Sequence, residues 1–218
     1  FRKGLDRYIV NASATFHRSY EAILADYEAG KADERQVGKV QELALGFLGG
    51  AGAFEVFGKA YGIRVSESDA RRMVDAWRRA NPWAVAHGQA LEVAYTRAMR
   101  HQGHEFSAGR VVYLFDGQHL WYALPSGRIL CYPYAKLESD GISYAKAAWK
   151  PAADAKEWPR ARLWRGLACE NVTQATANDI LRHALRQLDA AVLHVHDEIV
   201  RSEEHTSELQ SHSFISYA

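Results

Sequence analysis

The chain has 218 residues, of which 48% are hydrophobic and 24% are charged, the composition of an ordinary globular protein. Its 27 basic and 26 acidic residues give a net charge of +1, which neither predicts nor excludes nucleic-acid binding. Two cysteines without a CxxC pair exclude a disulfide framework and a cysteine zinc motif, and they favour a reducing cytoplasm. We expect no membrane association, because no apolar run reaches the ~18 residues of a membrane span and no signal peptide begins the chain.

The first fifty residues predict two helices. Alanine, glutamate and scattered apolar residues indicate a helix over residues 5–27, which Gly30 ends. Asp33 and Glu34 indicate the start of a second helix, since acidic side chains favour the positive end of the helix dipole. The pair Gly49–Gly50 predicts the end of this second helix.

Two further helices are predicted before residue 100. Ser66 with Asp69 forms a capping-box-like start for a helix over residues 70–80. Asn81 and Pro82 indicate the N-cap and first residue of the next helix. That helix has an apolar face, which carries Leu91, Ala94, Tyr95 and Ala98.

Beyond residue 100 the pattern changes to short alternating segments. Residues 111–115 and 120–124 flank Asp116-Gly117 and predict a β-hairpin with a tight turn. Residues 125–127 predict a second turn and residues 129–132 a third strand.

The last part of the chain returns to a helix and then to strands. Residues 139–156 are rich in alanine and lysine without a clear period, which predicts a loop. Residues 170–190 predict a helix, whose apolar face carries Ala177, Ile180, Leu181, Ala184 and Leu188. Residues 192–200 form an apolar strand-like run that is interrupted by His196-Asp197-Glu198, which predicts a hairpin with these three residues at its tip.

Residues 201–211, with the sequence RSEEHTSELQS, are polar and aperiodic. They resemble the translation of a sequencing-library adapter read in frame. We therefore expect residues 201–218 to be a non-native tail and the natural chain to be cut after Val200. A genuine polar tail is the alternative.

The helix predicted from Asp33 carries a ridge of residues spaced four apart, which comprises Arg35, Lys39, Leu43 and Phe47. Two cations one turn apart repel each other by ~0.2–0.5 kcal/mol, and a bound anion would reverse the sign. The rise of roughly 12 Å from Lys39 to Phe47 matches the reach from the triphosphate to the base of one nucleotide. The ridge therefore predicts phosphate binding at its basic end and base stacking on Phe47. A solvated face with snorkelling arginine and lysine is the alternative.

Asp197 and Glu198 are adjacent carboxylates inside an apolar run. Burying them unpaired is costly, and a divalent cation bound at one of them removes that cost. A solvated turn is the alternative. His194 and His196 share a strand face, but a third zinc ligand at a recognisable spacing is lacking.

The helix predicted from Glu170 carries an amide stripe, in which Asn171, Gln174 and Asn178 lie on one face. Amides both donate and accept hydrogen bonds, so they contact base edges or sugars without demanding one sequence. The stripe predicts contact with nucleic acid, and an exposed polar face is the alternative.

Taken together, these motifs resemble those of family A DNA polymerases, in particular the phage branch of the DNA polymerase I class. Three strings in order carry the resemblance: Arg35-xxx-Lys39 with Phe47-x-Gly49-Gly50 and Gly52-Ala53-Phe54, the helix ENVTQATANDIL from Glu170, and HVHDEIV from His194. The turn Leu124–Arg128 followed by Tyr132 resembles a hairpin of the phage branch. The resemblance covers roughly residues 1–200.

The resemblance implies an α+β fold with small antiparallel sheets and hairpins. Residues 1–100 would be a helical fingers region, and residues 101–169 a β-hairpin and loop insertion. Residues 170–200 would be part of the palm, with its helix and its catalytic hairpin. The implied activity is template-directed DNA synthesis from dNTPs on primer–template DNA in a phage-infected bacterial cell.

For the nucleotide, the resemblance implies a site on the helix from Asp33. Lys39 and Arg35 would hold the triphosphate, with Lys39 among the catalytic residues. Phe47 would stand where an aromatic residue shapes the nascent base pair. Leu43 would face the sugar, at a position where many cellular members have phenylalanine or tyrosine. In the family this position influences sugar discrimination and the rate of DNA synthesis, so the departure puts both properties in question.

For the metal and the DNA, the resemblance implies a site at the second hairpin. Asp197 would bind Mg²⁺ as one of two palm aspartates, with Glu198 beside it as a further catalytic residue. His196 would lie near the primer end, and Asn171 and Gln174 would contact primer–template. The chemistry would be two-metal phosphoryl transfer.

The chain departs from the family pattern upstream. The family's Asp-x-Ser-x-x-Glu strand motif, which holds the other metal aspartate, is absent, and residues 1–34 resemble the segment just after it. The chain also lacks an initiator methionine, so we expect a fragment that is inactive by itself. Two alternatives remain open: a non-catalytic nucleic-acid-binding module, and a single-subunit RNA polymerase relative, which the second and third strings disfavour.

Overall fold

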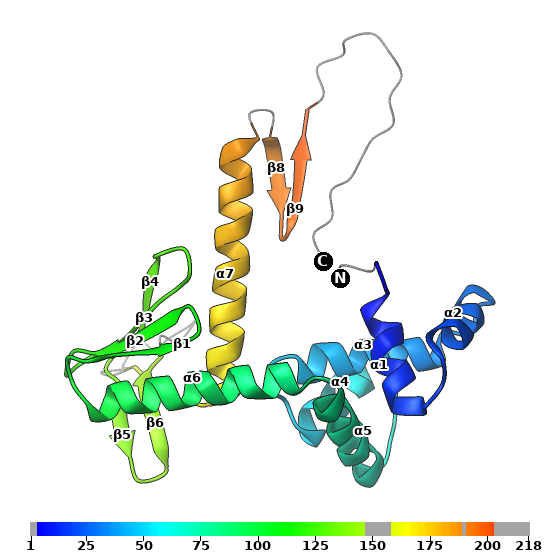
Figure 1. Cartoon of the computed structure of the whole chain (residues 1–218), viewed down its shortest axis with the longest axis horizontal. Helices are drawn as coiled ribbons and strands as arrows, with labels where there is room; N and C mark the ends of the chain where they lie inside the picture. The colour runs from blue at the N-terminus through cyan, green and yellow to red at the C-terminus, as the bar shows by residue number, and fades with distance from the viewer. Residues whose placement is uncertain (1–3, 147–157, 189–190, 203–218) are drawn as a thin grey trace.

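A computed structural model describes residues 4–146, 158–188 and 191–202. Within these residues, seven helices and nine strands form the predicted α+β fold (Figure 1). The helices are α1 (Arg7–Phe16), α2 (Tyr20–Glu28), α3 (Asp33–Leu45), α4 (Ala51–Ala60), α5 (Glu67–Ala80), α6 (Pro82–Arg100) and α7 (Arg165–Gln187). The strands are β1 (Glu105–Ala108), β2 (Val111–Phe115), β3 (Leu120–Ala123), β4 (Ile129–Tyr132), β5 (Lys136–Glu138), β6 (Gly141–Ala145), β7 (Arg160–Leu163), β8 (Ala191–Val195) and β9 (Glu198–Arg201). In the described part of the chain, no helix is both long and apolar enough to cross a bilayer.

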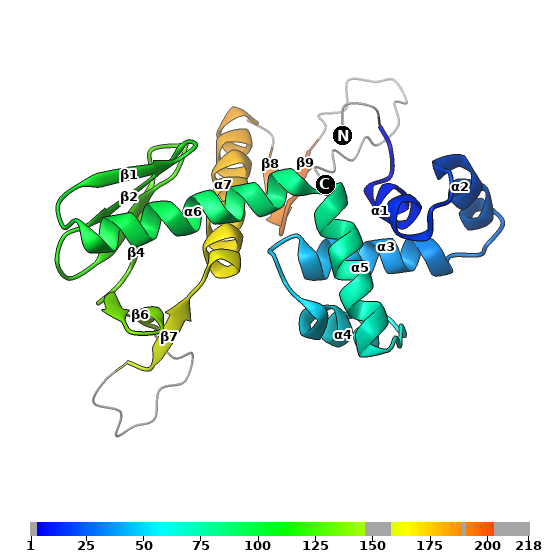
Figure 2. The same ribbon diagram turned by 60° about the horizontal axis from the view of Figure 1, so that its bottom comes forward.

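Helices α1 to α5 form a helical unit, in which α3 packs against α1, α4 and α5 (Figures 1 and 2). Its main core contains Val40, Ala44, Leu45, Phe54, Met73, Val74 and Trp77. The closest approach is at Gly38 of α3, where a Cβ atom would lie 2.0 Å from the carbonyl oxygen of Tyr8 on α1. One face of α3 is buried in this core, and the opposite face of the helix is the one that contacts solvent.

The helix predicted over residues 5–27 is wrong, because the chain forms two helices there. His17 adopts a left-handed conformation with φ of 54°, which ends α1. The Ser19 hydroxyl then accepts a hydrogen bond from the Ala22 amide and caps α2. Neither signal is apolar, so hydrophobic periodicity did not reveal the break.

The predicted start signals of α3 and α5 are confirmed, and that of α6 is confirmed in part, because the Asn81 side chain makes no cap hydrogen bond and donates to the Trp77 carbonyl instead. Helix α3 begins at Asp33, and the Ser66 hydroxyl accepts from the Asp69 amide at 3.1 Å to cap α5. Pro82 is the first residue of α6. However, α3 ends at Leu45 and not at Gly49, because residues 46–48 form a turn in which Leu48 has φ of 63°.

Helix α6 connects the helical unit to the sheets (Figure 1). Its 19 residues extend roughly 28 Å at 1.5 Å per residue. The predicted apolar face is buried: Leu91, Ala94, Tyr95 and Ala98 join the core of the sheet region. There the Tyr95 ring meets the Tyr113 ring of β2 edge-on, with 6.0 Å between their centroids.

The sheet region contains two antiparallel sheets, β1-β2-β3-β4 and β5-β6-β7. The predicted hairpins β2–β3 and β3–β4 are confirmed, although four residues, 116–119, join β2 to β3. The loop prediction is wrong where β6 lies, since Gly141–Ala145 pairs with both β5 and β7. Residues 147–157 of that prediction lie outside the described residues.

Helix α7 rises away from α6 and leads to the hairpin of β8 and β9 (Figure 1). Its N-terminal half is the buried half, with Gly166, Ala168, Cys169 and Val172 in the core. The apolar face predicted for residues 177–188 is not buried, and Ile180 is 64% exposed. Strand β9 extends to Arg201, and residues 203–218 of the predicted tail lie outside the described residues.

Candidate functional site

The predicted ridge lies on α3, which turns three of its four members to one side. Val40, Ala44 and Leu45 on the other side are buried in the core of the helical unit. Leu43 is 37% exposed, and Arg35 and Lys39 are half-buried. Phe47 lies beyond the end of α3, so it does not continue the helical ridge.

Arg35 is bound within the protein. Its Nε donates to Oδ2 of Asp6 at 2.8 Å, and one terminal nitrogen lies 2.8 Å from the same oxygen. The guanidinium also lies over two tyrosine rings, 4.4 Å from the centroid of Tyr27 and 5.1 Å from that of Tyr8. The sequence analysis did not identify Asp6, although its position before α1 is typical of an N-cap residue.

Lys39 lies one turn further along α3 in a different environment. Its Nζ is 4.9 Å from the centroid of the Tyr61 ring, beyond α4. Among the described residues no carboxylate forms an ion pair with Lys39. Within the described residues the ridge therefore contains one cation paired with a carboxylate, Arg35, and one cation without such a partner, Lys39.

Phe47 joins the helical unit to the rest of the fold. Its side chain packs against the core formed by α6, the sheets and α7. A Cβ atom on Gly166, at the start of α7, would lie 2.4 Å from the Phe47 carbonyl oxygen. Similarly, a Cβ atom on Gly88 of α6 would lie 2.0 Å from the Leu48 side chain. These close approaches hold the end of α3 against α6 and α7.

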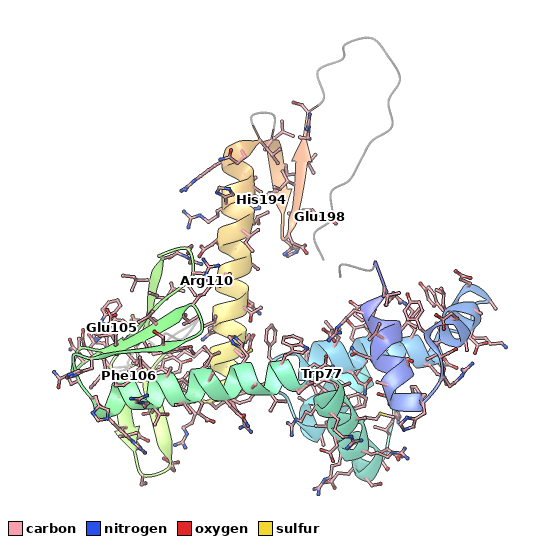
Figure 3. All side chains as sticks on the ribbon, in the orientation of Figure 1. Trp77, Glu105, Phe106, Arg110, His194 and Glu198 are labelled. Atoms are coloured by element: carbon pink, nitrogen blue, oxygen red, sulfur yellow. The ribbon has the colours of Figure 1, made fainter. Side chains whose placement is uncertain are left out.

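Asp197 lies in the two-residue turn between β8 and β9, with Glu198 as the first residue of β9. Asp197, Glu198 and His196 are all exposed. His196 has a positive φ of 53°, the backbone conformation that a two-residue hairpin turn requires. Figure 3 shows Glu198 beside the turn and His194 on β8. The predicted hairpin tip is thus present.

The hairpin tip carries two adjacent carboxylates, which are possible metal ligands. Mg²⁺ is commonly bound through one or two carboxylates, together with substrate phosphates and water. Asp197 and Glu198 fit that role. No group of three histidine, cysteine, aspartate or glutamate residues that could hold a metal ion occurs within residues 4–146, 158–188 and 191–202.

The amide stripe on α7 is divided between internal and exposed roles. The Asn171 side-chain amide donates to the Tyr132 hydroxyl at 3.1 Å, which ties α7 to β4. Gln174 is exposed and donates to Glu170 at 3.3 Å. Asn178 is also exposed. Gln174 and Asn178 are thus the amides that are accessible to a ligand.

The three groups of residues come from distant segments of the chain. In Figure 1 the turn end of the β8–β9 hairpin is the end drawn nearer to the helical unit. The hairpin base lies by the C-terminal end of α7 (Figure 1).

No family model matches the chain. A DNA polymerase from Bacillus phage SP02 is 37% identical to it over 172 residues, which cover 76% of this chain and 26% of the phage protein. The chain thus spans about a quarter of the length of the curated relative that it matches.

Proposed function

We propose that this chain is the nucleotide-binding part of a phage-type DNA polymerase of family A, with α1 to α6 as fingers and α7 with β8 and β9 as part of the palm. The observation that carries the proposal is the 37% identity to the phage SP02 DNA polymerase over 172 residues. The half-buried Lys39 on α3, which has no carboxylate partner among the described residues, and the acidic turn of the β8–β9 hairpin support it, because nucleotidyl transfer requires both kinds of group.

The incoming dNTP would lie along the exposed side of α3. Lys39 would bind the triphosphate, since its charge is not neutralised by any described carboxylate. Leu43, one turn further on, would contact the sugar. Phe47 packs in the core that joins α3 to α7, and we assign it the role of anchoring that end of the nucleotide site.

The primer terminus would lie between α3 and the hairpin. Mg²⁺, when bound, would supply activation of the primer 3′-hydroxyl and stabilisation of the charge on the leaving pyrophosphate. Asp197 would hold the ion from the hairpin turn, with Glu198 next to it. His196 would contact the primer end, and the exposed amides Gln174 and Asn178 would contact the primer–template duplex. Asn171, which donates to Tyr132, would hold α7 in place rather than contact DNA.

A second carboxylate is needed to fix a pair of metal ions about 4 Å apart. We propose that polypeptide outside these 218 residues supplies it, and that the chain alone does not extend a primer. The exposed apolar side chains of the hairpin support this, since a two-stranded hairpin is marginal without a further strand or a packing partner. They are Val192, Leu193, Val195 and Val200.

Primer extension with Mg²⁺ tests the proposal. We expect no extension by the 218-residue chain and clear extension by a longer polypeptide that adds the corresponding upstream region of the phage SP02 polymerase. Asp197→Ala in the longer polypeptide should abolish extension and leave binding of primer–template intact. Extension by the chain alone that disappears in Asp197→Ala would refute the need for an outside carboxylate. Duplex binding without any extension by the longer polypeptide would favour a non-catalytic nucleic-acid-binding module.

A further inference from the structure

The Asp6 carboxylate divides its two oxygens between two tasks. Oδ1 accepts from the amides of Tyr8 at 2.8 Å and Ile9 at 3.3 Å, and so caps α1. Oδ2 accepts from Arg35 on α3, 29 residues away in the chain. Asp6 and Arg35 have side chains that are only 27% and 21% exposed, so water screens this contact less than it would a surface ion pair.

The Arg35 guanidinium does not depend on Asp6 alone for its position. It lies over the rings of Tyr27 and Tyr8, at 4.4 and 5.1 Å from their centroids. Planar guanidinium groups stack well on aromatic rings. Without the carboxylate, the group would keep this position and regain hydrogen-bond donors that Asp6 now occupies.

We propose that Asp6 is a positioning residue that sets the triphosphate affinity of α3 by neutralising Arg35; this rests on the proposed binding of a dNTP along α3. A triphosphate that approaches Arg35 meets a guanidinium whose Nε and one terminal nitrogen are already engaged by Asp6, and a carboxylate that repels it. Lys39 lies over the Tyr61 ring and forms no ion pair with a carboxylate of the described residues, so it would provide most of the charge that binds phosphate. Arg35 contributes only to the extent that it is released from Asp6.

The structure provides a variant that separates the two tasks of Asp6. Asparagine caps helices about as well as aspartate, so Asp6→Asn keeps an oxygen for the Tyr8 and Ile9 amides. An amide nitrogen then takes the place of Oδ2 and cannot accept from Arg35. Asp6→Ser, which also retains a capping oxygen, is a second variant with the same expected result.

The experiment is a titration of the 218-residue chain with a fluorescent dATP analogue, followed by anisotropy and by competition with inorganic triphosphate. The proteins are the wild type, Asp6→Asn, Asp6→Ser, Arg35→Ala, Lys39→Ala and the double variant Asp6→Asn/Arg35→Ala. Thermal unfolding of each protein shows whether it is folded. We expect Asp6→Asn to tighten binding about threefold to tenfold, the range for a released charge-assisted contact.

The tightening should require Arg35, so the double variant should bind no better than Arg35→Ala. Arg35→Ala alone should change the affinity by less than about twofold, since its charge is already neutralised, whereas Lys39→Ala should weaken binding clearly. The proposal for Asp6 is overturned if folded Asp6→Asn and Asp6→Ser bind no more tightly than the wild type while Lys39→Ala still weakens binding. Binding that is absent in every protein, or insensitive to Lys39, would instead refute the proposed nucleotide site.

Discussion

Arg128, in the turn between β3 and β4, forms an ion pair with Asp179 of α7, with 2.7 Å between Nε and Oδ1. A terminal nitrogen of Arg128 donates to the Ala175 carbonyl at 2.7 Å, and the Ser126 hydroxyl donates to Asp179 at 2.5 Å. The turn between β3 and β4 and the segment ENVTQATANDIL of α7 therefore form the two sides of one interface. This interface fixes the middle of α7, beyond which the helix leads to the hairpin that carries Asp197.

Asp179→Asn should destabilise this interface. The Asp179 side chain is only 12% exposed, and the change leaves Arg128 without its counter-charge. We expect a loss of about 1–3 kcal/mol in the free energy of unfolding, measured by urea denaturation. Asp140→Asn is the matched control, because the Asp140–Arg162 pair is exposed and should contribute little. Equal effects of the two substitutions would contradict a specific role for the Arg128–Asp179 pair.

The β2–β3 loop should be sensitive to acid through Asp116. Hydrogen bonds from the His119 amide, from the Trp121 ring nitrogen and from the Gln118 amide lower the pKa of Asp116 to about 2. Unfolded aspartate has a pKa of about 3.9, so this contribution to stability is present above about pH 4 and is lost as the pH falls toward 2.

Asp116→Asn isolates that contribution. Asparagine keeps an acceptor for the Gln118 and His119 amides, which bind Oδ1, and loses the acceptor for Trp121, which binds Oδ2. We expect the variant to melt at a lower temperature than the wild type above pH 5, and the difference to shrink between pH 4 and pH 2. A difference that stays constant down to pH 2 would show that the carboxylate charge is not the cause.

Lys39→Ala should impair the use of dNTPs far more than the binding of DNA. In a longer, active polypeptide we expect kcat/KM for dNTP to fall by roughly 30- to 1000-fold, the effect of losing a charged contact that strengthens in the transition state. Lys59→Ala on α4 is the control, since Lys59 is an exposed lysine outside the ridge. Steady-state kinetics at saturating primer–template measures both. Normal dNTP efficiency with weakened duplex binding would refute the assignment of Lys39.

Leu43→Tyr should change the selection of the sugar. Leu43 is 37% exposed on α3, one turn from Lys39, so a larger polar side chain there would meet the incoming sugar. We expect better incorporation of dideoxynucleotides relative to deoxynucleotides, measured in single-turnover assays with the longer polypeptide. An unchanged ratio would mean that Leu43 does not face the sugar.

Local features of the fold could be predicted from the sequence because their causes lie within a few residues. Ser66 caps the amide of Asp69 three residues away, and Pro82 begins α6 with its own fixed φ. The apolar face of α6 and the hairpins β2–β3 and β8–β9 follow from periodicity and turn residues in the same way. The positions of Lys39 and Leu43 on one side of α3 also belong to this group.

The remaining features depend on which segments meet. The sequence of β6 shows no clear hydrophobic period. The strand forms because it pairs with β5 and β7. Two ion pairs join residues that are far apart in the chain. Asp6 and Arg35 are 29 positions apart, and Arg128 and Asp179 are 51 positions apart. Hydrophobic periodicity specifies which face of a helix is apolar, but the exposed Ile180 on α7 shows that it does not specify whether a partner covers that face. The sequence by itself thus determined the capped helix starts, the hairpin turns and the residue types of the candidate site, whereas only the tertiary structure decided which of its cations is neutralised, because a charge is cancelled by the neighbours that folding brings to it.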